Sequence, residues 1–247
     1  MSEQEPVIVK AWLEGDIHDL QTLARLLDDG DTRVVRDPEM GTYYLTAPEI
    51  DNPPSGTASY ESARELTARV NGFGRVADTG FRPVRLTGAF SDGDSVHQVI
   101  FVESVAEARV SVGAPTITVT RGDGTVVPSP PSPWPGRFAV STKHPDVVEV
   151  LEIMGQTEPL GWADLFKVHE KIQDSIGGSI PKMGWASNAE DSAFGASANR
   201  YDVSGQDARH ARRESSPPPK RTMTIQQGRD YISGVSAKWL DWLQSRS

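Results

Sequence analysis

A cationic stretch between residues 199 and 229 is the first place to look for a polar site in this 247-residue chain. It carries seven cationic and three acidic side chains, a net charge of +4 in a chain whose formal net charge is −9. The cations are Arg200, Arg209, Arg212, Arg213, Lys220, Arg221 and Arg229. A local excess of positive charge in an acidic protein favours a site for an anionic ligand.

Arg209 and His210 supply the chemistry that such a site would use. An arginine can hold a phosphate with two parallel hydrogen bonds, and a histidine can move a proton near neutral pH. If residues 207–213 form a helix, Arg209 and Arg213 lie four residues apart on one face. The further candidate ligand-binding residues are Asn199, Arg200 and Arg212. This set predicts a phosphate or RNA-backbone site, and the alternative is that the cations pair with acidic neighbours in the same chain.

His169 is another candidate for catalysis. It follows Leu165 by four residues, on the apolar face of a helix predicted at 162–176. No H-E-x-x-H motif arises because position 173 is glutamine, and the five histidines show no metal-ligand spacing, so we expect no metal and no cofactor. The pattern favours a histidine at the edge of the core with a hydrogen-bond partner. The alternative is a catalytic role, shared with His210 across a pair of helices.

The composition bounds the class of protein. Hydrophobic residues make up 37% of the chain and charged residues 24%, which is typical of a globular protein with a real core. The absence of cysteine excludes disulfides, thiolate metal sites and cysteine nucleophiles. The acidic start of the chain lacks a signal-like apolar run, and no window is apolar enough to span a bilayer. We therefore expect a soluble cytoplasmic protein without a membrane partner.

The elements that must position these residues fall into an α+β pattern. Residues 1–127 predict a mainly antiparallel sheet with about two helices. The strands are predicted at 7–12, 32–35, 42–46, 83–90, 96–103, 108–112 and 116–120, and the helices after Asp16 and at 59–70, where N-G-F-G-R at 71–75 ends the second one. A proline-rich linker is predicted at 128–136, as an extended spacer between two domains.

Residues 137–247 predict a helical domain. Helices are expected at 146–154, 162–176, 187–199, 207–213 and 224–243, with Thr224 as the N-cap of the last. A proline-rich break at 215–220 separates the final two.

The segment from Trp162 to Trp242 resembles the helical C-terminal part of a group of uncharacterised bacterial proteins. The matching features are W-A-D-L-F-K-V-H-E-K-I, S-A-N-R, G-Q-D-A-R-H, a proline-rich break and a closing helix that ends in W-L-D-W-L. More loosely the segment is similar to HEPN-type domains, many of which are metal-independent ribonucleases of bacterial defence. The resemblance implies that Arg209 holds phosphate and His210 acts as general acid or base. HEPN domains carry the two residues a few positions apart on one helix, whereas here they are adjacent.

Three functions remain open at this point. The first is a non-catalytic module that binds an unknown protein or an anionic ligand, RNA being a possible one, through residues 200–213. The second is a HEPN-like ribonuclease or another bacterial defence effector. The third is a structural or assembly protein. A homodimer is possible in each case.

Overall fold

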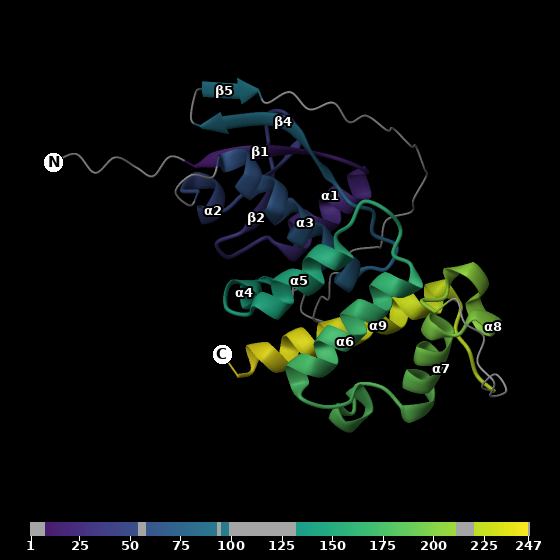
Figure 1. Ribbon diagram of the computed structural model, residues 1–247. Coiled ribbons are helices and arrows are strands. Elements are labelled where there is room, and N and C mark those ends of the chain that lie inside the picture. The colour runs from purple at the N-terminus through teal and green to yellow at the C-terminus, as the bar shows by residue number, and fades with distance from the viewer. Residues whose placement is uncertain (1–7, 54–57, 93–94, 99–131, 211–219, 247) are drawn as a thin grey trace, which may run out of the picture.

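A five-stranded antiparallel sheet forms one end of the molecule in the computed structural model, which describes residues 8–53, 58–92, 95–98, 132–210 and 220–246 (Figure 1). The strand order is β2-β3-β1-β4-β5, with β1 at Val9–Glu14, β2 at Arg33–Arg36, β3 at Tyr43–Thr46, β4 at Arg85–Asp92 and β5 at Ser95–Gln98. The side chains of the central strand β1 alternate, so Ala11 and Leu13 are buried while Glu14 is exposed. Helices follow the sheet in the chain, and the predicted α+β class is confirmed.

Three helices connect the strands, namely α1 at Ile17–Leu26, α2 at Pro48–Asp51 and α3 at Ser59–Ala77. Asp16 caps α1 as its sequence predicts, because its carboxylate accepts a hydrogen bond from the His18 amide at 2.9 Å. The prediction that residues 71–75 end the second long helix is wrong, since α3 runs on to Ala77. The Asn71 side chain forms two hydrogen bonds of 2.9 Å with the backbone of Val84, one as donor and one as acceptor. Asn71 does not break the helix because these bonds hold its side chain away from the helix backbone.

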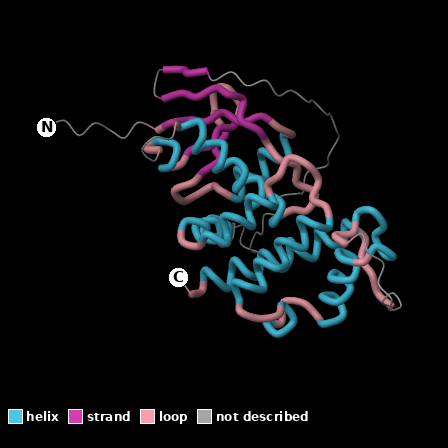
Figure 2. The backbone as a smooth tube through the Cα atoms, in the orientation of Figure 1, coloured by secondary structure: helices cyan, strands magenta, loops and turns pink. Residues whose placement is uncertain are grey.

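The remaining helices build the other end of the molecule, where α5 packs against α3 on the side away from the sheet (Figures 1 and 2). They are α4 at Trp134–Ala139, α5 at Pro145–Met154, α6 at Trp162–Ile176, α7 at Asn188–Asn199, α8 at Tyr201–Ser204 and α9 at Ile225–Gln244, with 3-10 turns at Val140–Thr142, Ile180–Met183 and Gly205–Asp207. Ser187 and Thr224 cap α7 and α9 through capping boxes with Glu190 and Gln227. Helix α6 has the bounds that its apolar spacing predicts.

Two other predictions of helical boundaries are corrected. Trp134 and Pro135 were expected in an extended spacer, but they form the first turn of α4. Proline is tolerated there because the amides of the first turn have no acceptor within the helix. The helix expected at 207–213 does not start, because Asp207 ends a 3-10 turn and Ala208 is extended. Residues 211–213, the strands expected at 108–112 and 116–120, and residues 128–131 of the linker expected at 128–136 lie outside the described residues.

Helices α3 and α5 cross at close range and join the two parts of the chain. A Cβ atom on Gly72 would overlap the carbonyl group of Leu151, and one on Gly155 would overlap the carbonyl group of Ala68. Phe73 packs edge-to-face against Phe138, with ring centroids 5.1 Å apart. Both belong to a hydrophobic core that is continuous from the sheet to α9. The division into two domains at 128–136 stays a prediction.

Two arginines hold the loop between α5 and α6 and so fix where α6 begins. Nη1 of buried Arg75 donates to the carbonyl oxygens of Met154 and Gln156 at 2.8 and 2.7 Å. Arg229 donates to the carbonyl oxygen of Leu160 through Nε and Nη2 at 3.1 and 2.9 Å. Burial, and after it the charge of Arg229, lower the pKa of Arg75 to about 10, so that it keeps its charge at neutral pH.

Candidate functional site

Helix α6 is the support of the candidate site. Its inner face buries Leu165, Val168 and Ile172 completely, which fixes the direction of the opposite face. The helix starts after Gly161, whose amide donates to the Asp164 carboxylate at 3.2 Å, and ends at Gly177, which has a left-handed φ of 61°. The packed inner face and the two defined ends of α6 therefore fix the orientation of its outer face.

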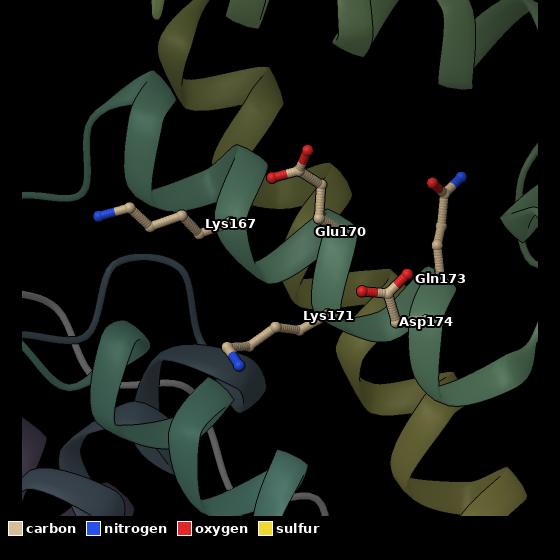
Figure 3. Close-up of a pocket in the computed structure, with 5 residues that line it drawn as sticks. All are labelled: Lys167, Glu170, Lys171, Gln173 and Asp174. Carbon is tan, nitrogen blue, oxygen red and sulfur yellow. The ribbon is translucent and has the colours of Figure 1, made fainter.

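That outer face is charged and hollowed. Five residues of α6 line a shallow hollow that is open to solvent: Lys167, Glu170, Lys171, Gln173 and Asp174 (Figure 3). Lys171 points toward α5, where it forms an ion pair with Glu149 (Figure 3). Positive and negative side chains alternate along the face, so the hollow suits a ligand that carries both signs of charge more than it suits a uniform polyanion.

Arg209 reaches this face from the segment after α7. Its amide donates to the carbonyl oxygen of Ala198 at 2.8 Å, and its guanidinium lies 4.6 Å from the centre of the Phe166 ring. Nη1 donates to the Glu170 carboxylate at 3.3 Å, and the side chain is 37% exposed. Its other N–H groups have no partner among the described residues. The arginine is thus oriented by a ring and a carboxylate while part of its fork stays available to a ligand.

His169 lies behind Phe166, inside an aromatic cluster of α6, α7 and α9. Its ring is tilted against that of Phe194 with the ring centroids 5.0 Å apart, and Phe194 stacks on Tyr231 with centroids 4.9 Å apart. One oxygen of Asp191 accepts from His169 Nε2 at 2.8 Å and from the Tyr231 hydroxyl at 2.6 Å. Asp191 is thus the hydrogen-bond partner predicted for His169. The His169 side chain is only 7% exposed and its Nδ1 has no partner, which indicates a structural role for the histidine.

The pKa values of this network follow from its burial. Burial of the Asp191 carboxylate acts to raise its pKa, but the hydrogen bonds from His169 and Tyr231 outweigh burial and hold the pKa below its ordinary value. Burial, and then the Asp191 carboxylate, raise the pKa of Tyr231 well above its ordinary value. Asp191 is therefore ionised and Tyr231 neutral over the whole physiological range, so both the tyrosine and the histidine donate to the carboxylate.

Replacing Tyr231 with phenylalanine is expected to lower the free energy of unfolding by about 1.5 kcal/mol at neutral pH, because a hydrogen bond to a buried ionised group is lost. The raised pKa of folded Tyr231 makes its contribution complete below a pH of about 10 and lost as the pH rises further. The lowered pKa of Asp191 makes its contribution complete above a pH of about 4 and lost as the pH falls. Urea unfolding from pH 3 to 11 should thus show a difference in the free energy of unfolding between wild type and variant. This difference should be constant around neutral pH and should shrink toward both pH extremes.

Tyr44 gives the matched control for this measurement. It is a partly exposed tyrosine of the sheet whose hydroxyl has no hydrogen-bond partner among the described residues. Tyr44→Phe should leave the free energy of unfolding nearly unchanged at every pH. A Tyr231→Phe variant as stable as wild type at neutral pH would show that the bond to Asp191 contributes nothing.

The other residues predicted for the site are dispersed. Arg200 is buried, and its Nε and Nη2 donate to the Asp202 carboxylate at 3.0 and 2.8 Å. Asn199 donates to the carbonyl oxygen of Gly195 at 3.0 Å, and its side-chain oxygen is buried without a partner. His210 is exposed beside Arg209. Arg212 and Arg213 lie outside the described residues.

Sequence reasoning missed Phe166, Glu170, Asp191 and Tyr231 as parts of the site. Asp191 lies 22 residues from His169 and 40 from Tyr231, and Glu170 lies 39 from Arg209, so no local spacing marks these pairs. The one usable signal was Glu170 itself, which follows His169 on the predicted helix and points away from its apolar face.

No model of a protein family, no curated protein and no solved structure matches this chain. In the part of the chain that the structure describes, no helix has both the length and the apolar character that crossing a bilayer requires. Nor do three or more potential metal-ligating side chains come together there. The function has to be inferred from the residues of the site.

Proposed function

We propose that this protein is a non-catalytic binding module that engages an acidic group of a partner protein through Arg209. The observation that carries the proposal is the state of this guanidinium. It is exposed, fixed in direction by Phe166 and Glu170, and has N–H groups left over for a second anionic partner. An arginine whose direction is fixed in advance loses less entropy when it forms a forked pair with a carboxylate.

The charge of the surroundings favours a protein partner over an RNA backbone. Binding to a nucleic-acid backbone depends on several cations that neutralise successive phosphates. Around Arg209, however, Glu170 and Asp174 accompany Lys167 and Lys171 on the same face. Arg200 is buried against Asp202, and Arg229 is bound to a carbonyl oxygen, so neither of these two cations supports a continuous phosphate track.

Replacing Arg209 with alanine is expected to weaken the binding of an acidic peptide by about 1.5–2 kcal/mol, or about 10- to 30-fold, because one charge-assisted forked pair is lost. Isothermal titration calorimetry with a glutamate-rich peptide, at low and high salt and in EDTA, measures this change. Arg209→Lys should recover part of the affinity, since lysine keeps the charge without the fork.

Arg246 offers a matched control. Its guanidinium also lies over an aromatic ring, 4.1 Å from the centre of Trp242, and it is exposed, but it follows the end of α9. Arg246→Ala should bind the peptide like wild type. Equal loss in both variants would indicate general electrostatic attraction and contradict a site at Arg209.

An RNA oligonucleotide tested in the same buffers separates the ribonuclease hypothesis. Cleavage of the RNA in EDTA by wild type, and not by His210→Ala, would replace the binding proposal with metal-independent ribonuclease chemistry. Tighter binding of RNA than of the acidic peptide, without cleavage, would overturn the choice of a protein partner.

A further inference from the structure

The exposed face of α6 carries four charged side chains at the spacing of a single helical surface. Lys167, Glu170, Lys171 and Asp174 stand at positions i, i+3, i+4 and i+7 (Figure 3). Exposed residues with little side-chain bulk flank this surface, with Ala163 near the start of the helix and Gly177 and Gly178 just after its end. A second helix could therefore approach along the whole face.

Two of the four charges are neutralised within the chain and two are not. Glu170 pairs with Arg209 and Lys171 pairs with Glu149, so both have partners from other elements. Lys167 and Asp174 have no ion-pair or hydrogen-bond partner among the described residues. They are opposite in sign and seven residues apart, which places them on one line along the helix, about 10.5 Å from each other.

Within a single copy of the chain the opposite charges at i, i+3 are accompanied by like charges at i, i+4, so Lys167 and Asp174 are only partly compensated. Lys167 and Lys171 are like charges at i, i+4, and so are Glu170 and Asp174. Asp174 also lies in the last turn of α6, where the helix dipole is negative. A partner that places a cation on Asp174 and an anion on Lys167 would neutralise both side chains at once.

We propose that a second copy of this chain docks on the outer face of α6, with the two α6 helices antiparallel about a two-fold axis. Such an axis passes midway between residues 167 and 174, so Lys167 of one copy faces Asp174 of the other, and the reverse. Both unpaired charges are then neutralised by the same surface. Any other partner would have to supply opposite charges at the same separation.

The centre of this interface is compatible with the pairing. Close to the axis, Glu170 of one copy lies near Glu170 of the other. On the other side of the helix, Lys171 of one copy lies near Lys171 of the other. These like charges do not oppose association strongly, because Arg209 and Glu149 already neutralise them within each copy. Solvent-exposed ion pairs contribute little each, so we expect a weak dimer that salt disrupts.

Charge exchange at the two positions tests the proposal in the full chain. Lys167→Glu places like charges opposite each other twice, as does Asp174→Lys, so each variant alone should self-associate about tenfold more weakly than wild type. The double variant Lys167→Glu/Asp174→Lys restores opposite charges and should associate like wild type. An equimolar mixture of the two single variants should also associate, because every facing pair is then of opposite sign.

Analytical ultracentrifugation up to about 1 mM protein distinguishes the outcomes. Association of wild type, the double variant and the mixture, with loss in the two single variants, supports the proposal. A wild type that stays monomeric, single variants that associate as wild type does, or a mixture that fails to associate each overturns it. Circular dichroism checks folding, and if one single variant misfolds, the comparison of the double variant with the other carries the test. None of these changes alters Arg209, so the result does not depend on the binding function proposed for it.

Discussion

Replacing Gly72 with alanine is expected to lower the free energy of unfolding by about 3 kcal/mol or more, the largest effect we expect from a single added methyl group. Gly72 lies in α3 where α5 crosses it, and a Cβ there would overlap the Leu151 carbonyl oxygen and lie 2.7 Å from the carbonyl carbon. The obstacle is backbone, so no side-chain rotation can relieve it. The two helices would have to separate, which would open the core around Phe73 and Leu151. Urea unfolding of the purified variant measures the loss.

Gly195 supplies the control for this experiment. It also lies inside a helix, α7, but a Cβ at Gly195 would meet nothing within 4 Å. Gly195→Ala should therefore stabilise the protein slightly, by about 0.5–1 kcal/mol, because alanine favours the helix. A Gly72→Ala variant within about 0.5 kcal/mol of wild type would contradict the close crossing of α3 and α5.

The same glycines explain where the sequence misled the prediction of α3. In isolation N-G-F-G-R has the composition of a helix end, because glycine favours a chain reversal. In the folded protein Gly72 provides room for Leu151, and Gly74 provides room for the ring of Phe81, which a Cβ would approach to 2.7 Å. Close approach and helix termination use the same residue type, and only the position of the partner helix separates them.

Elements that are specified locally were predicted well. Helix α6 has the predicted bounds, because the apolar spacing from which it was predicted is a signal within one short segment. The caps at Asp16 and Thr224 were likewise predictable from residues next to them in the chain. Each of these features depends on contacts only a few residues apart.

The candidate site was predictable only in part, for the converse reason. Arg209 and His169 were singled out by residue type, and the structure brings Phe166 against both of them. The partners that define their roles, Glu170 and Asp191, come from distant positions. Charge counting also grouped Arg200 with Arg209, although Arg200 is buried and paired with Asp202. Net charge along a sequence does not reveal which cations reach the surface.

Replacing Arg75 with methionine is expected to lower the free energy of unfolding by about 2–3 kcal/mol. Methionine keeps most of the buried volume of the arginine stem, so the change mainly removes hydrogen bonds. The carbonyl oxygens of buried Met154 and exposed Gln156 would lose their donor, and an unpaired buried group such as the first costs about 1–3 kcal/mol. Removal of a desolvated charge near Arg229 offsets part of this loss. Urea unfolding gives the total, and hydrogen exchange should show faster opening of amides at 155–165.

Arg229→Met separates the hydrogen bonds from the charge. Arg229 is less buried and binds one carbonyl oxygen, that of Leu160, so its replacement should cost about 1 kcal/mol. Both variants relieve the same repulsion between the two guanidinium groups, and the difference in unfolding free energy between them therefore compares the bonds of Arg75 to Met154, Gln156 and Glu158 with the bond of Arg229 to Leu160. If Arg75→Met were as stable as wild type or more stable, desolvation of the charge would outweigh those bonds. The loop would then be held by packing, and the position of α6, with the Arg209 surface on it, would not depend on Arg75.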